Sequence, residues 1–226
     1  DVLGSRGLGD VYKRQVDDVA AYLTEVQTIR RQYEGRCQFY AAMEIDYLSE
    51  ECGPASDYYR NLPLDYRIGS VHFIPTQDGD YVDIDGKYDI FRSRMERCFR
   101  NDIDYVVDTF FTQSVKMVEA GGFDILGHLD KIAQNASYYA PGIEDGEHYR
   151  SRVDKLIDLV IQKGICVEIN TKARILHGRF FPAERYLKRF VEAGTTLVVN
   201  SDAHEPDKIE SSRAEAYKIL DSYAKN

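Results

Sequence analysis

Residues 38–48 read QFYAAMEIDYL, a largely apolar run that carries two carboxylates near its end. Gly35 precedes the run, and a loop with Gly53 and Pro54 follows it. A short apolar run between such turn signals is typical of a buried β-strand. The run therefore predicts a strand that delivers Glu44 to its carboxyl end.

Helical and extended patterns alternate along the rest of the chain. Apolar residues spaced by three and four predict a helix over 16–34, and residues 89–120 are helical with a break near 101–104. The other predicted strands are 68–74, FDILGH (123–128), 165–170 and 195–200; the other predicted helices are 146–163, 182–193 and a polar helix from about residue 208. This alternation predicts one α/β domain whose parallel strands form a sheet or a barrel.

The first fifteen residues, DVLGSRGLGDVYKRQ, differ from this pattern. They carry glycines that fit no turn, and they join directly onto the first amphipathic helix. The stretch resembles translated sequencing-adaptor read-through. We therefore expect residues 1–15 to be non-native and residues 16–226 to form the domain.

Composition and charge exclude several classes of protein. The 226 residues are 43% hydrophobic with a net charge of −9, and basic residues are scattered among acids, so we expect no nucleic-acid partner. No run of about 18 apolar residues and no signal-peptide pattern is seen, which predicts a cytoplasmic protein without a membrane partner. The four cysteines have no zinc-site spacing, and we expect reduced thiols.

Acidic and histidine residues recur where the predicted strands end. Four of the five strands end this way, at Glu44, His72, His128 and the pair Asp202 and His204. Alone, each has a plainer explanation, such as a hydrogen-bonded structural histidine or an aspartate that caps a helix. Together they are expected to converge on one edge of the sheet, as ligands of divalent metal ions. The remaining histidines, His148 and His177, are expected at the surface.

The segments MEIDYL, GSVHFI, DILGHLD, VEINT and NSDAH resemble, in order, successive motifs of the polymerase-and-histidinol-phosphatase (PHP) family. The combination is most similar to the histidinol-phosphatase branch, and the resemblance runs from residue 16 to the end. It implies a distorted (βα)7 barrel with two or three metal ions on its carboxyl-terminal rim. In this pattern Glu44 bridges two metals, His72 and His128 complete one site, Asp202 joins the second, and His204 binds a third.

The sequence departs from the family pattern at its start. The family begins with a strand bearing His-x-His, followed by further ligands, whereas the first histidine here is His72. The resemblance therefore implies a missing first strand region, one complete metal site and two incomplete ones. We expect this fragment to bind about one ion, to expose strands 38–48 and 195–200 as sheet edges, and to be marginally stable and inactive.

For the intact protein the resemblance implies a metal-dependent phosphomonoester hydrolase, namely a histidinol-phosphate phosphatase of histidine biosynthesis. Zinc, iron or manganese would activate water, and no GxSxG nucleophile signature is present. Lys172, Arg174 and Arg179 are candidates for binding the small phosphorylated substrate, with Lys131 a weaker one; solvated loop charges are the alternative.

Two other functions stay open. The first is a PHP phosphoesterase that acts on nucleotides or nucleic-acid ends, and the second is a non-catalytic domain that retains the fold. The sequence leaves the oligomeric state undetermined.

Overall fold

A five-stranded parallel sheet forms the centre of the computed structural model, which describes residues 7–224 and the side chains of residues 18–223. Its strands, in spatial order, are β1 (Ala42–Asp46), β2 (Tyr66–Ser70), β5 (Ile125–Leu126), β6 (Cys166–Asn170) and β7 (Leu197–Asn200). Every neighbouring pair is parallel. The carboxyl ends of all five strands therefore lie along one edge of the sheet.

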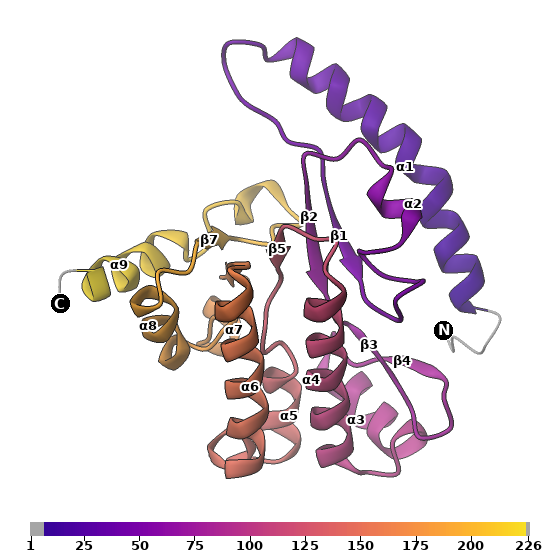
Figure 1. Ribbon diagram of the computed structural model, residues 1–226, viewed down its shortest axis with the longest axis vertical. Helices are drawn as coiled ribbons and strands as arrows, with labels where there is room; N and C mark the ends of the chain where they lie inside the picture. Colours follow the sequence, from indigo (N-terminus) through magenta and orange to yellow (C-terminus); the bar gives the residue numbers. More distant parts are fainter. Residues whose placement is uncertain (1–6, 225–226) are drawn as a thin grey trace.

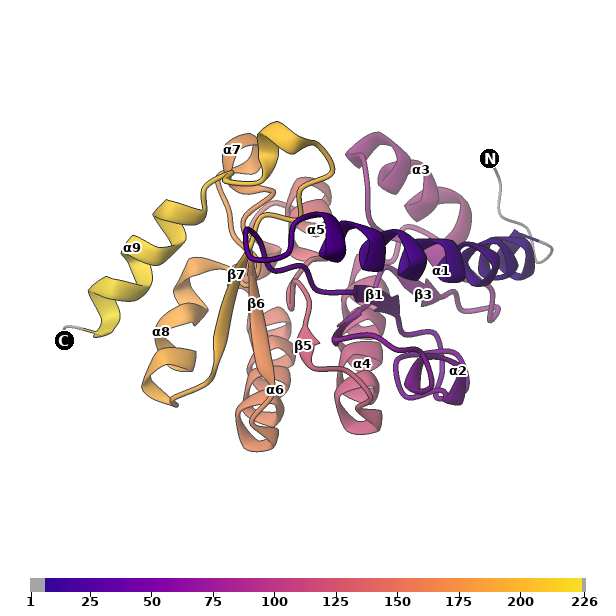
Figure 2. The same ribbon diagram turned by 90° about the horizontal axis from the view of Figure 1, so that it is seen from above.

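Two long helices cover one face of this sheet. Helices α4 (Ile103–Ala120) and α6 (Glu147–Lys163) lie side by side in both ribbon views (Figures 1 and 2). The Asp102 side chain caps α4 by accepting a hydrogen bond from the Tyr105 N–H at 2.9 Å. Both helices bury one apolar stripe, as the three-and-four spacing predicts. The large buried side chains of that stripe are Phe110, Phe111, Met117, Tyr149, Val153, Leu156 and Val160.

The remaining elements surround the sheet. They are α1 (Gly7–Gln32), α2 (Asp57–Arg60), α3 (Tyr88–Cys98), α5 (Ala133–Tyr139), α7 (Arg174–His177), α8 (Glu184–Glu192), α9 (Arg213–Ala224) and the 3-10 turns Ile143–Asp145 and Pro206–Lys208. Strands β3 (Phe73–Pro75) and β4 (Tyr81–Asp83) form a separate antiparallel hairpin. In Figure 1, β1 and β2 point downward, and this hairpin lies with α3 and α5 at the lower end.

The α/β class and the parallel sheet are as the sequence predicts. Strands β1 and β7 are the two edges, and among the described residues no pairing closes them into a barrel. Helix α1 lies beside β1, while α9 lies at the β7 edge (Figure 2). The Tyr22 hydroxyl donates to the Ala42 carbonyl at 2.8 Å and accepts from the Ala42 N–H at 3.0 Å. Helix α1 thus occupies part of the edge that β1 leaves open.

Several predicted boundaries are wrong, since strand β1 spans only Ala42–Asp46 of the predicted 38–48 and helix α9 begins at Arg213, not near residue 208. Helix α1 begins at Gly7, not near residue 16, so helical structure extends through most of the stretch 1–15; residues 1–6 lie outside the described part. The predicted strand 68–74 is two strands, because the His72 N–H donates to the Asp46 side chain instead of a neighbouring strand. The break in residues 89–120 is confirmed by the ends of α3 and α4. Within residues 7–224, none of the helices combines the length and apolar character needed to cross a membrane.

The α4–α6 layer leads to the first testable prediction. Leu156 has no exposed surface and lies in the main core, so Leu156→Ala should lower the free energy of unfolding by about 2–5 kcal/mol, because it leaves a cavity. Lys155→Ala, at the neighbouring exposed position, should change it by less than about 0.5 kcal/mol. Urea unfolding followed by circular dichroism measures both. Equal values for the two variants would contradict this packing.

Candidate metal centre

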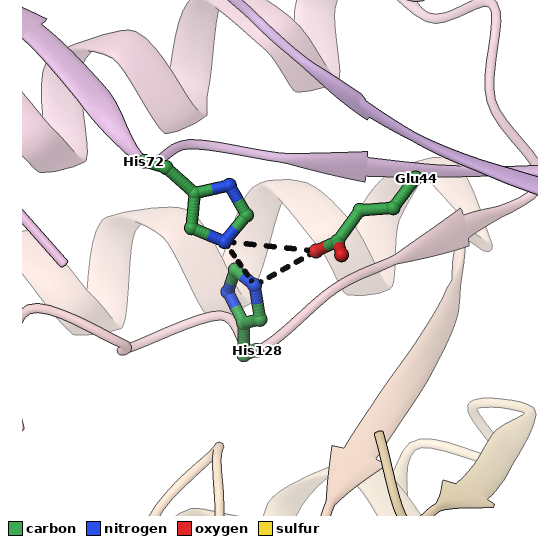
Figure 3. Close-up of side chains that lie close together, drawn as sticks. All are labelled: Glu44, His72 and His128. Atoms are coloured by element: carbon green, nitrogen blue, oxygen red, sulfur yellow. Dashed lines mark hydrogen bonds and ion pairs between the residues drawn. The ribbon is translucent and has the colours of Figure 1, made fainter. Parts of the chain in front are cut away.

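Three side chains from three neighbouring strands meet at the carboxyl edge of the sheet (Figure 3). The Nε2 atoms of His72 and His128 are 2.9 Å apart, and His128 Nε2 is 2.9 Å from Glu44 Oε1. His72 Nε2 lies 3.7 Å from the same carboxylate oxygen. Two imidazole nitrogens and one carboxylate oxygen therefore face a common point.

The strand register explains this convergence. Glu44 lies within β1, opposite Ile68 of β2, while His72 follows the end of β2 and His128 follows β5. Gly127 precedes His128 at a place where a side chain does not fit, because a Cβ atom there would lie 2.4 Å from Ser70 Oγ. That Ser70 hydroxyl donates to Glu44 Oε1 at 2.6 Å. The glycine thus lets β5 approach β2 closely without displacing a group that holds Glu44.

Asp46 fixes the orientation of His72. Its Oδ1 atom accepts both the His72 main-chain N–H at 3.0 Å and the ring Nδ1–H at 2.8 Å. In the neutral ring, a proton on Nδ1 leaves the Nε2 lone pair free for a metal ion at the point shared with Glu44 and His128. A carboxylate behind an imidazole is the arrangement that orients and strengthens histidine ligands of metals.

The charges of the three groups strongly influence one another. Burial alone would raise the pKa of Glu44, but the hydrogen bond and charge of His128 and the charge of His72 hold this pKa well below its ordinary range. Burial alone would lower the pKa of His72, but the hydrogen bond and charge of Asp46 and the charge of Glu44 raise it to about 9. The centre thus favours an ionised carboxylate next to positive charge.

The donor set fits a divalent metal ion. Glu44 Oε1, His72 Nε2 and His128 Nε2 lie within 4.8 Å of one another, and within the described part of the chain no other such group of three is found. Two nitrogen atoms 2.9 Å apart can share only one proton. A metal cation at the common point would instead bind the lone pairs of both nitrogens and of the carboxylate oxygen. Nitrogen and oxygen donors in this combination suit zinc, iron or manganese.

Comparison with known proteins identifies the family of this chain. Residues 14–172 match the PHP domain family, which is more than half of the chain. The chain belongs to the PHP domain family. The matched residues include Glu44, His72 and His128, and they end before Asp202 and His204.

Two relatives extend the comparison. A protein of Deinococcus radiodurans described as "Probable histidinol-phosphatase" is 22% identical over 215 residues, which cover 92% of this chain and 74% of that protein. The crystal structure of "the putative histidinol phosphatase hisK from Listeria monocytogenes" superimposes with a TM-score of 0.74 at 18% identity. That match covers 88% of this chain and 76% of the other, and it shows a common PHP-type, barrel-like fold.

Asp202 and His204 lie at the same edge of the sheet but outside the group of three. Asp202 Oδ2 accepts from Asn170 Nδ2 at 3.2 Å and pairs with Lys172 Nζ at 3.1 Å. His204 Nδ1 is 3.5 Å from Asp202 Oδ1. Asp202 adopts a left-handed backbone conformation, with φ of 48°, which is uncommon outside glycine. Their roles as ligands of further metals stay predictions.

The predicted phosphate-binding residues have different surroundings. Arg174 pairs with Glu215, and Arg179 is largely buried between Glu144 at 3.0 Å and Asp130 at 3.8 Å. These pairings engage both guanidinium groups within the protein, so the geometry gives neither a free charge for phosphate.

The two lysines are ion-paired as well, and they differ in exposure. Lys172 is about half exposed beside Asp202. Lys131 pairs with Asp85 at 3.3 Å, and burial alone would raise the pKa of Asp85, but the charges of Lys131 and His72 lower it. Lys131 is thus engaged within the protein as Arg179 is, with a side chain that is only 15% exposed, and its role in phosphate binding stays a prediction.

The two remaining histidines lie apart from the centre. His148 is half exposed and pairs with Asp108 at 2.9 Å, and His177 is exposed and hydrogen bonds to the Tyr138 hydroxyl. All four cysteines are free thiols, as expected.

Sequence reasoning did not assign roles to Asp46, Ser70, Asp85 or Glu168. The sequence could have pointed to Asp46, because it stands two positions after Glu44 and therefore on the same face of the strand. Ser70 could have been found by the same spacing, because it precedes His72 by two residues. Glu168 also stands out in the sequence, as a carboxylate between the apolar residues Val167 and Ile169, whereas Asp85 does not, because its role depends on which loop packs against it.

The shifted pKa of His72 predicts a pH dependence of stability in chelator-treated protein. The unfolded side chain titrates near 6.5 and the folded one near 9, so the folded state binds this proton more tightly. The contribution of His72 is therefore complete below pH 6.5 and is lost as the pH rises through about 9. Glu44 stays ionised over this range.

Melting temperatures from pH 6 to 10 test this expectation. The difference between wild type and His72→Gln should shrink as the pH rises, whereas His177→Gln, at an exposed position with no ion pair among the described residues, should melt in parallel with wild type. A difference for His72→Gln that is constant or grows with pH contradicts the predicted sign.

Proposed function

We propose that this PHP domain is part of a metal-dependent phosphomonoester hydrolase that converts L-histidinol phosphate and water to L-histidinol and phosphate. The observation that carries the proposal is the convergence of Glu44 Oε1, His72 Nε2 and His128 Nε2 in a PHP chain. The names of the two relatives support the choice of substrate.

Glu44, His72 and His128 would hold the metal. A bound divalent cation lowers the pKa of a water ligand and neutralises phosphoryl oxygens. The chain contributes the geometry, because Asp46 directs the His72 lone pair and Ser70 holds the Glu44 carboxylate. One complete donor group predicts about one tightly bound ion per chain.

Access to the centre is one-sided. The His128 side chain is 4% exposed, whereas the Glu44 side chain is 42% exposed. A substrate would therefore approach from the Glu44 side. Lys172, whose side chain is 46% exposed, is the candidate for holding a phosphoryl oxygen there.

Metal and substrate titrations of chelator-treated protein test the proposal. Calorimetry with Mn²⁺ or Zn²⁺ should give about one ion per chain, and Glu44→Gln should weaken binding at least about tenfold, because it removes the one anionic donor. Glu192→Gln, which changes an exposed carboxylate on α8, is the matched control and should bind like wild type. Metal-loaded protein should then bind L-histidinol phosphate more tightly than AMP.

The metal titration and the substrate titration test different parts of the proposal. Equal metal affinity in wild type and Glu44→Gln would exclude the centre described above. Tighter binding of AMP would keep the metal centre but contradict the proposed substrate.

A further inference from the structure

Glu168 is a buried carboxylate in the middle of β6 whose oxygens face two neighbouring strands. Its side chain accepts three hydrogen bonds from N–H groups. Oε2 accepts from the His128 main-chain N–H at 2.9 Å and from Asn170 Nδ2 at 3.3 Å, and Oε1 accepts from Asn200 Nδ2 at 3.0 Å. The donors come from the segment after β5, from β6 itself and from β7. One side chain thus joins the carboxyl ends of three adjacent strands.

The same network reaches Asp202. Asn170 Nδ2 is shared between Glu168 Oε2 and Asp202 Oδ2, at 3.3 and 3.2 Å. Asp202 holds a left-handed backbone conformation that needs support from its surroundings. Glu168 therefore connects His128, a member of the metal centre, with the second acidic group on the same edge.

Packing alone does not explain a carboxylate at this position. Glu168 is 4% exposed, and its neighbours Val167 and Ile169 are buried apolar residues, as is usual for a central parallel strand. Among the described residues Glu168 makes no ion pair, and burying an unpaired carboxylate is costly. The cost is offset by three N–H donors, one of which belongs to His128. This placement suggests a role at the metal centre.

We propose that Glu168 is a positioning residue that fixes the main chain at His128 and thereby places His128 Nε2 beside His72 and Glu44. The inference rests on the proposed metal centre. His128 follows a strand of only two residues, so β5 itself gives this loop little support. The hydrogen bond that the His128 N–H donates to Glu168 supplies this constraint, because it joins the His128 main chain to the longer strand β6.

Two substitutions separate geometry from charge. Glu168→Gln keeps an acceptor for the His128 N–H, and its amide N–H can face Asn200, whose own amide can turn to accept it. Glu168→Ala removes every acceptor. Asp108→Ala, which breaks ion pairs between α4 and α6, controls for general loss of stability.

The variants are compared below their melting temperatures by three measurements. These are Co²⁺ affinity, the visible absorption spectrum of bound Co²⁺, and hydrogen exchange at the His128 amide. For Glu168→Ala we expect Co²⁺ binding weaker by about 10- to 100-fold, an altered spectrum and faster exchange at His128. Glu168→Gln should stay within about threefold of wild type. Asp108→Ala should lower the melting temperature while keeping the wild-type affinity and spectrum.

The outcomes distinguish this inference from the proposed function. Wild-type affinity and spectrum in Glu168→Ala would overturn the positioning role alone. Equal weakening in Glu168→Gln and Glu168→Ala would also overturn it, because charge would then matter and geometry would not. Failure of the wild-type protein to bind Co²⁺ would instead contradict the metal centre, and this inference with it.

Discussion

The close approach of two imidazole nitrogens to one carboxylate oxygen is the constraint on which the rest of the centre depends. His72 Nε2 and His128 Nε2 are 2.9 Å apart, and both face Glu44 Oε1. Such an arrangement persists only if the strands that carry the three residues are held in register. The parallel pairing of β1, β2 and β5 provides that register, because it brings their carboxyl ends to one edge.

Groups behind the ligands complete the centre, and each acts through a specific contact. Asp46 orients the His72 ring, and Ser70 holds Glu44 while Gly127 leaves room for its hydroxyl. Glu168 occupies the corresponding place behind His128, where it binds the main chain rather than the ring. The donors are therefore supported from three strands, which is how a protein keeps charged groups close together before a cation binds.

Sequence patterns predict the long elements and the three converging residues, because periodicity and strand ends are local properties. They predict less well where a contact distant in sequence decides the outcome. The strand at 68–74 is interrupted because Asp46 takes the His72 N–H, and β5 is only two residues long. Arg174 and Arg179 follow β6 as predicted phosphate ligands, yet Glu215 and Glu144, each more than 30 residues away, engage their guanidinium groups. Residue type alone gave no sign of these partners.

Anomalous diffraction from crystals of the protein grown with Zn²⁺ tests the central claim most directly. The account predicts one strong peak about 2.0–2.2 Å from Glu44 Oε1, His72 Nε2 and His128 Nε2, with the His72 Nδ1–H still donated to Asp46. A peak bound by Asp202 and His204 alone, with Glu44, His72 and His128 hydrogen bonded only to one another, would contradict it.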